Sequence, residues 1–343
     1  MATKISVNEI CDLSTRILLH SGMSIDDAQI VVDHLLDGEL SGHPSHGFYR
    51  IPAIANGMKK AGPAKEIVLE NDSQTSALLN GNSRQGLVVA LRATEMAIKK
   101  AKLGTIAVIG AYNYLGTTGG MGYFTTKIAQ ADMVGIMLAN SGSATPPWGG
   151  IQPIFGTNPI SISIPSENRP IVIDLATSKW AYGDIDLALK AGRTLPLGVV
   201  QDKEGNPSTD PNDALNGAML PFGEHKGYAL ALAIELLAGP LVRAKAGSLA
   251  VPGSDGLLIV AINPIMFVQV EEFKKQVSCL IKEIKDSPKK SGVDEIYYPG
   301  EKSQLARERN KRIGSIEMVD RVLTDLRTLA EGKSDKSTEK DYI

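Results

Sequence analysis

The sequence is poor in cysteine, in long apolar runs and in charge imbalance, and each shortage excludes a class of protein. Two cysteines, Cys11 and Cys279, are too few for a disulfide framework, and both fall in helical apolar patterns. The longest apolar run, YALALAIELLAGPLV, contains Glu235 and Pro240 and is too short to span a bilayer. The 36 basic and 38 acidic residues form no basic stretch suited to a phosphate backbone. We therefore expect no membrane span and no nucleic-acid partner.

The first residues, MATKISVNEI, lack the apolar segment of a secretory signal. Free cysteines are typical of a reducing compartment. Together these features predict a cytoplasmic protein.

Two nucleotide-binding signatures are also missing. The chain contains neither G-x-G-x-x-G in the required context nor G-x-x-x-x-G-K-[ST]. The glycine-rich stretch Gly116-Thr-Thr-Gly119-Gly120-Met-Gly122 follows an apolar strand pattern, TIAVIGA, but does not fit either signature. It is a tight, flexible connection or a loop that approaches a ligand closely.

What is present indicates two interlocking domains in 343 residues, more than one hydrophobic core usually supports. Residues 1–70 have helical patterns, beginning with the capping box Ser6-Val-Asn-Glu9. From about residue 71, the β-rich runs TSALLNG, TIAVIGA and MVGIMLANS alternate with helical segments. The segment KGYALALAIELLAG is apolar on nearly every face, which predicts a buried helix. We expect four parts, with bounds 1–70, 71–222, 223–330 and a frayed tail at 331–343.

The sheet is expected to be mixed. Alternating strands and helices favour parallel pairing. The runs ISISIPS and IVIDLAT, however, are separated only by a Pro-Ser-Glu-Asn turn, which favours an antiparallel pair. The predicted fold class is therefore α/β (α+β), with a mixed sheet and a largely helical second domain built from both chain ends.

The stretch DGELSGHPSHGFYR holds two of the five histidines, His43 and His46. If the segment after Pro44 is helical, Arg50 lies one turn after His46 on the same face, with Ser45 beside it. Histidine exchanges protons near neutral pH, and arginine grips a carboxylate through two parallel hydrogen bonds. A proton donor beside a carboxylate clamp is what the reduction of an α-keto acid requires.

Two other readings of this stretch stay open. In the first, His43, His46 and either Glu39 or Asp37 are ligands of a metal-dependent hydrolase, although a third well-placed ligand is not evident. In the second, the histidines are unrelated side chains on one bend.

Three further segments have features of a binding site. Residues 140–159, NSGSATPPWGGIQPIFGTNP, form a long uncharged loop that must be held against something. In IVIDLATSKWAYG, Asp174 ends an apolar strand and two hydroxyl residues follow. In PFGEHKGYALAL, His225 and Lys226 stand at a helix N-terminus, where a cation opposes the helix dipole unless an anion is bound.

These stretches, in this order, resemble the malate/L-lactate dehydrogenase family that lacks a Rossmann fold. The family also holds 2,3-diketogulonate reductase, ureidoglycolate dehydrogenase, sulfolactate dehydrogenase and a cyclic imine reductase. The resemblance runs from about residue 5 to 330 and rests on Ser45-His46-Gly47 with Arg50 and on the segments PPWGGIQPIFGTNP, IVIDLATS, DKEGNPSTDP and PFGEHKGYALALAIELLAG.

The resemblance implies a nicotinamide-dependent oxidoreductase that forms a homodimer, with sites near the subunit interface. It implies that residues 1–70 carry the proton donor His46 with Ser45 beside it, that 71–222 bind NAD or NADP through a non-Rossmann fold, and that 223–330 complete the substrate domain. The implied cofactor-binding residues are Ile173, Asp174, Leu175, Ala176, Thr177, Ser178, Lys179, His225, Lys226, Gly300, Glu301 and Lys302. Neither metal nor any partner beyond a small substrate and a second copy is expected.

Arg50 is the candidate for the substrate carboxylate, and the expected substrate is a small 2-hydroxy or 2-oxo acid or a cyclic imino acid. The residues expected to line the substrate are Tyr114, Asn140, Pro147, Trp148 and Thr157. The sequence departs from the family at Asn113-Tyr114, where many members have a histidine after the asparagine. A third possible function, beside the oxidoreductase and the hydrolase, is therefore a catalytically silent protein that keeps the cofactor domain.

Overall fold

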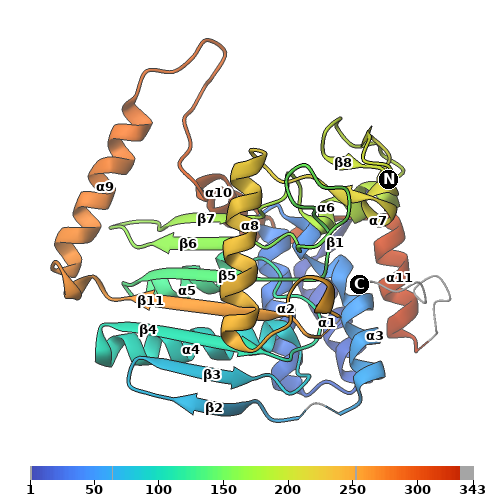
Figure 1. Cartoon of the computed structure of the whole chain (residues 1–343), viewed down its shortest axis with the longest axis horizontal. Helices are drawn as coiled ribbons and strands as arrows, with labels where there is room; N and C mark the ends of the chain where they lie inside the picture. The colour runs from blue at the N-terminus through green and yellow to red at the C-terminus, as the bar shows by residue number, and fades with distance from the viewer. Residues whose placement is uncertain (1, 64, 252, 333–343) are drawn as a thin grey trace.

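A seven-stranded mixed sheet forms the centre of the molecule (Figure 1). The computed structural model describes residues 2–63, 65–251 and 253–332. The strand order is β2-β3-β4-β11-β5-β6-β7. Only β3 and β4 pair in parallel among neighbouring strands of this sheet, and the β6–β7 pair is antiparallel as the short turn predicts. The strands are β2 (Val68–Asp72), β3 (Ser76–Asn80), β4 (Ile106–Tyr112), β5 (Val134–Ala139), β6 (Ile160–Ile164), β7 (Ile171–Leu175) and β11 (Gly256–Ile262).

The position of β11 corrects the expected bounds. It belongs to 223–330, which we expected to complete the helical domain, yet it lies between β4 and β5 in the middle of the sheet. Its sequence GLLIVAI is apolar on both faces, as a strand covered on both sides requires. The sheet therefore combines segments from both sides of the predicted boundary at residue 222.

Helices cover both faces of the sheet. On β4, Ile109 packs into the large core with α4 (Gly86–Gly104) and α5 (Gly122–Gln130), whereas Val108 packs against the cluster under α8 (His225–Ala238). Because successive strand residues point to opposite faces, α8 lies on the side opposite α4 and α5.

Helix α8 is not buried all round, contrary to the sequence expectation. It buries Gly227, Ala231, Ile234, Glu235 and Ala238 against the sheet. Its outer face is exposed and apolar, with Leu232, Leu236 and Leu237 at 37, 53 and 40% exposure. An apolar outer face on one chain suits a helix that a second molecule covers.

The two chain ends meet beside the sheet. Strand β1 (Ala2–Ser6) pairs antiparallel with β12 (Ser315–Val319). Helices α1 (Val7–His20), α2 (Ile25–Leu40) and α3 (Ile51–Ala61) pack with α10 (Glu301–Ile313) and α11 (Asp320–Ala330). The predicted cap is present, since Ser6 Oγ accepts a hydrogen bond from Glu9 N at 3.1 Å. From residue 333 on, the predicted frayed tail lies outside the described residues.

The remaining elements lie at the periphery. Figure 1 shows α9 (Val270–Asp286) standing beside the strand ends, away from the helices of the chain termini. No helix in the described part of the chain is long and apolar enough to cross a membrane. The other regular elements are α6 (Tyr182–Lys190), β8 (Val200–Gln201), β9 (Pro207–Ser208), α7 (Asp213–Asn216), β10 (Ala218–Met219) and the 3₁₀ turns η3 (Pro240–Val242), η4 (Gly247–Leu249) and η5 (Pro264–Met266).

Candidate active site

The stretch with two histidines folds as two 3₁₀ turns, η1 (Pro44–His46) and η2 (Phe48–Arg50), rather than one continuous helix. Pro44 has the backbone angle needed to begin η1. Gly47 separates the turns, and its backbone lies so close to Glu39 that a Cβ atom there would be 2.0 Å from Glu39 Oε1. The close approach of α2 thus fixes where the first turn ends.

His46 is held beside both residues that we expected to act with it. The Ser45 hydroxyl lies 3.2 Å from His46 Nδ1, and Arg50 Nε donates a hydrogen bond to the Ser45 carbonyl at 2.7 Å. Burial, followed by the positive charge of Arg50, lowers the pKa of His46 well below 6.5. The neutral imidazole, which can accept a proton, is therefore favoured at neutral pH.

His43 has a different set of contacts. Its Nε2 atom lies 2.9 Å from the Ser303 hydroxyl, in the first turn of α10. The two histidines thus have separate partners, as expected for side chains that do not share a ligand.

The carboxylates of the alternative metal site are engaged elsewhere. Asp37 accepts a hydrogen bond from Arg307 at 2.8 Å. Glu39 Oε1 accepts one from the Phe48 backbone at 2.9 Å, and burial raises the pKa of Glu39 to about 7. Both carboxylates serve the protein's own groups, which removes the support for the hydrolase reading.

Sequence analysis missed three close neighbours of this turn. Gly120, from the glycine-rich stretch, approaches His46, since a Cβ atom on it would be 3.9 Å from His46 Cβ. His34 Nε2 lies 3.0 Å from the Gly120 carbonyl oxygen. At the start of α6, a Cβ atom on Gly183 would be 2.9 Å from a terminal nitrogen of Arg50. The only sequence signals were a histidine in an apolar stripe and glycines without a motif.

Three segments predicted to bind cofactor or substrate come together at the end of β7. The Thr177 backbone and hydroxyl both donate to the Thr157 carbonyl at 2.8 Å, and Phe222 N donates to the Thr177 carbonyl at 2.9 Å. Ser178 is buried, and its hydroxyl donates to Trp180 O at 2.6 Å. The hydroxyls are thus used internally, which leaves mainly backbone for a ligand. Of the predicted residues here, Asp174, Leu175 and Lys179 are exposed and Ile173 and Ala176 are half-buried.

His225 and Lys226 open α8 directly after this junction. Both are exposed at the N-terminus of a 14-residue helix. The preceding Glu224 has a φ of 60°, which lies in the left-handed region that few residues other than glycine adopt. The helix end and the lysine together present positive potential to solvent.

The segment Gly300-Glu301-Lys302 lies at the start of α10 and abuts the other part of β7. Val172 N donates to the Pro299 carbonyl at 3.1 Å. Glu301 is buried and paired with Lys285 at 2.5 Å, and the Lys302 ammonium lies 4.7 Å from the centre of the Tyr297 ring. The buried Glu301 carboxylate is therefore engaged in an ion pair with Lys285, which leaves it little access to a cofactor.

The residues expected to line the substrate differ in burial and in their hydrogen-bond partners. Tyr114 is only 1% exposed and packs in the large core, and Asn140 bonds the backbone of Lys245 and Gly256, both at 2.8 Å. Pro147 is half-buried and Trp148 is 50% exposed. Of this set, Thr157 is hydrogen-bonded to the β7 junction through its carbonyl oxygen. Tyr114 packs in the core and Asn140 hydrogen-bonds to backbone groups. The sequence pattern alone does not distinguish these roles from substrate binding.

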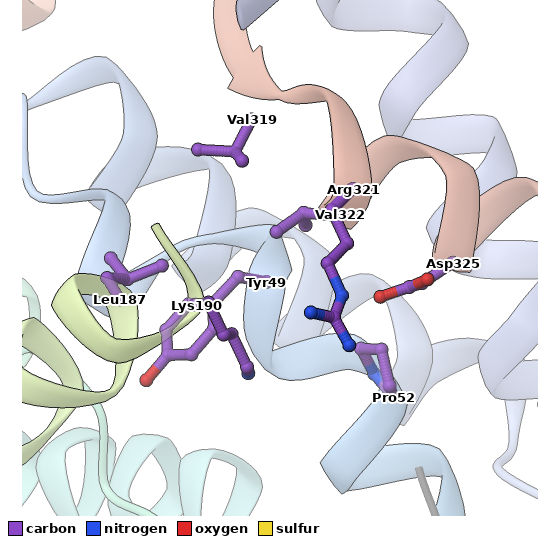
Figure 2. Close-up of a pocket in the computed structure, with 8 residues that line it drawn as sticks. All are labelled: Tyr49, Pro52, Leu187, Lys190, Val319, Arg321, Val322 and Asp325. Carbon is purple, nitrogen blue, oxygen red and sulfur yellow. The ribbon is translucent and has the colours of Figure 1, made fainter. Parts of the chain in front are cut away.

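A pocket is lined by Tyr49, which belongs to η2, and by residues of α3, α6 and the C-terminal segment (Figure 2). The Tyr49 ring has the Arg50 guanidinium 5.4 Å and the Lys190 ammonium 5.0 Å from its centre. The wall is completed by Pro52, Leu187, Val319, Arg321, Val322 and Asp325. Since His46 does not line it, this pocket is distinct from the place where a proton would be exchanged.

Comparison with known proteins gives a family match over nearly the whole chain. The model of the family described as malate/L-lactate dehydrogenase matches residues 5–327. The chain is 38% identical to malate/(S)-sulfolactate dehydrogenase of Methanothermus fervidus, covering 95% of this chain and 97% of that protein. It is 31% identical to ureidoglycolate dehydrogenase (NAD(+)) of Escherichia coli O157:H7, covering 92 and 93%.

The fold is likewise shared with a solved structure. The crystal structure of malate dehydrogenase from Entamoeba histolytica superposes with a TM-score of 0.90 at 26% identity, covering 97% of this chain and 98% of that one. Sequence and structure therefore match the same kind of protein from end to end.

Proposed function

The chain belongs to the malate/L-lactate dehydrogenase family of NAD(P)-dependent oxidoreductases, and we propose that it acts on a small 2-hydroxy acid or the corresponding 2-oxo acid, with the cofactor exchanging the hydride and the segment 45–50 exchanging the proton and binding the acid. The observation that supports this is the placement of Ser45, His46 and Arg50 on two successive 3₁₀ turns, with His46 partly buried and hydrogen-bonded to Ser45. A related cyclic imino acid fits the same chemistry.

We assign the proton exchange to His46. Its depressed pKa makes the neutral ring the base that removes the hydroxyl proton when a 2-hydroxy acid is oxidised. In reduction the protonated ring returns that proton, and the negative charge of a bound acid favours this form. The Ser45 hydroxyl at Nδ1 orients the ring so that Nε2 is free for the substrate.

We assign the substrate carboxylate to Arg50. Its Nε is used by the Ser45 carbonyl, so the two terminal nitrogens remain to bind a carboxylate. The same hydrogen bond links the carboxylate-binding group to the residue beside the proton donor. The rigid link fixes the distance between the two functions.

The β7 junction and the start of α8 fit NAD or NADP. The exposed Leu175 and the half-buried Ala176 suit the close approach of a flat or phosphate-bearing group, and Lys226 at a helix N-terminus suits a pyrophosphate. Bound there, the cofactor would supply the hydride acceptor or donor. We propose that residues 173–179, His225 and Lys226 hold it, with Gly300 and Lys302 near the far end of β7.

Turnover assays test this function. NADH and NADPH oxidation should be followed with pyruvate, oxaloacetate, a sugar-derived diketo acid and a cyclic imine, with and without exhaustive chelation. We expect turnover on at least one acid and no effect of the chelator, because the chemistry needs no metal. Cofactor binding without turnover on any substrate would identify a silent homologue, and activity restored by zinc would identify a metalloenzyme.

We also propose that a second copy of the chain covers the outer face of α8. Leu236 and Leu241, together with Leu249 and Val251 in the following segment, are 53, 62, 70 and 58% exposed. Apolar surface of this kind is stabilised by burial against a partner. Leu236→Glu should convert a dimer into monomers in sedimentation experiments, while the exposed-site control Leu103→Glu, on α4, should not. A parent chain that sediments as a monomer would contradict the proposal.

A further inference from the structure

The glycine loop before α5 packs between two histidines. Gly119 has a φ of 63°, and a Cβ atom on it would be 2.2 Å from His34 Cε1. On the other side, a Cβ atom on the next residue, Gly120, would be 3.9 Å from His46 Cβ and Cγ, so the loop runs beside the His46 side chain. No side chain fits at Gly119, so the loop can run between the two histidines only with glycine at this position.

His34 holds this loop in place through a hydrogen bond to its backbone. The ring is 2% exposed, is stacked on Phe124 with a centroid distance of 5.2 Å, and places Nε2 3.0 Å from the Gly120 carbonyl. Burial lowers the pKa of His34 to about 4, so the ring is neutral. Because its partner is a carbonyl oxygen, Nε2 carries the proton and donates. Nδ1 is then a buried acceptor without a partner in the described residues, so packing alone does not explain a histidine here.

The other end of the loop is fixed by Asp174. Its Oδ2 atom accepts a hydrogen bond from Gly122 N, the first residue of α5, at 2.7 Å. Gly122 also lies against β7, since a Cβ atom on it would be 3.1 Å from Val172 Cγ1. Burial raises the pKa of Asp174 to about 6, and the hydrogen bond from Gly122 opposes this shift. The same hydrogen bond ties the start of α5 to β7.

We propose that Gly119–Gly122 is a bridge through which the cofactor-binding strand β7 sets the position of His46, with Asp174 and His34 as its positioning residues. The proposal rests on the proposed function, which identifies β7 as a cofactor-binding strand and His46 as the residue that exchanges the proton. It changes the role of Asp174, whose side chain serves the bridge while the backbone around it faces the cofactor. His34 keeps Gly120 against the His46 ring when substrate is bound.

Three variants separate the bridge from simple packing. His34→Leu removes the donor to Gly120, whereas His34→Gln retains an N–H at the corresponding position. Phe124→Leu is the matched control, because it removes packing against the same ring without touching the hydrogen bond. The readouts are kcat, the pH profile of kcat/KM, the melting temperature, and cofactor Kd from nicotinamide fluorescence.

We expect His34→Leu to lower kcat by about 10- to 100-fold and to shift the pH profile, with cofactor Kd within about twofold of the parent. His34→Gln should recover most of the loss. Phe124→Leu should lower the melting temperature without shifting the pH profile. A His34→Leu enzyme with parental turnover, or a loss that His34→Gln does not recover, would overturn the bridge.

The Asp174 end is tested by combination. At saturating cofactor, the His34→Leu/Asp174→Asn double variant should lose no more activity than the worse single variant, because either change releases the same loop. Losses that multiply would show two independent roles and overturn the proposal.

Hydrogen exchange gives a readout that needs no turnover. Cofactor binding should slow amide exchange in peptides covering 116–124 of the parent and much less in Asp174→Asn. An inactive parent that still shows this protection would contradict the proposed function but support the bridge. Equal amide exchange in these peptides of the parent with and without bound cofactor would overturn the bridge.

Discussion

The Nε2 atom of His43 lies 2.9 Å from the hydroxyl of Ser303, 260 positions further along the chain. This contact draws His43 toward α10 and away from the Ser45 hydroxyl that holds His46. His46→Asn should therefore lower kcat by roughly two to four orders of magnitude, with cofactor binding nearly intact. His43→Asn should cost less than about tenfold. Steady-state kinetics of both variants decide the point, and equal losses would mean that the two residues share one task.

The depressed pKa of His46 sets the pH dependence of oxidation. The active form is the neutral ring, and burial with Arg50 moves its pKa below 6.5, so protonation removes activity only at lower pH. The kcat/KM for 2-hydroxy acid oxidation should be flat between about pH 7 and 8 and should fall on the acid side below 6.5. An acid limb centred above pH 7 would show that the free enzyme holds His46 protonated.

Lys226 has no stabilising role at the start of α8 unless an anion is bound. Lys226→Met should raise cofactor Kd by about tenfold, the loss of one charge-assisted contact, and leave the apo melting temperature unchanged or slightly higher. Lys203→Met, at an exposed turn, is the control. Equal cofactor affinity in the parent and Lys226→Met proteins would exclude the assignment.

Glu39 should make stability depend on pH. Its folded pKa of about 7 exceeds the ordinary value of 4.5, so the native state binds its proton more tightly than the unfolded state does. The free energy of unfolding therefore decreases as the pH rises from about 4.5 through about 7. Glu39→Gln avoids the loss, and its melting temperature relative to the parent should increase by about 2–4 °C between pH 5 and 8. Glu167→Gln, an exposed substitution, should show no such trend.

Tyr114 tests packing against substrate binding. Its hydroxyl is buried without a hydrogen-bond partner in the described residues. Tyr114→Phe should leave the substrate ranking unchanged and keep or raise the free energy of unfolding, by up to about 1–3 kcal/mol. Denaturant unfolding and the substrate panel measure both. A changed ranking would return Tyr114 to the substrate site.

Local patterns in the sequence predicted much of this molecule. The Ser6 cap and the antiparallel β6–β7 pair followed from residue types a few positions apart. The family resemblance, confirmed by the match over residues 5–327, supplied the chemistry.

Long-range relationships could not be read in the same way. An apolar run such as GLLIVAI does not reveal which strands it will separate, and the apolar α8 suits burial by its own chain or by another. Tyr114 and His34 differ in role because of what packs around them. Gly120 lies beside His46 although the two residues are 74 positions apart, and no spacing rule describes this relationship.

The central place of β11 governs the order in which the chain can fold. During synthesis β2, β3 and β4 emerge as one group and β5, β6 and β7 as another, and neither group hydrogen-bonds to the other. Each keeps an open edge, at β4 and at β5, until β11 enters between them. A nascent chain that stops near residue 222 therefore exposes two aggregation-prone edges, so assembly of the sheet has to wait for the last third of translation.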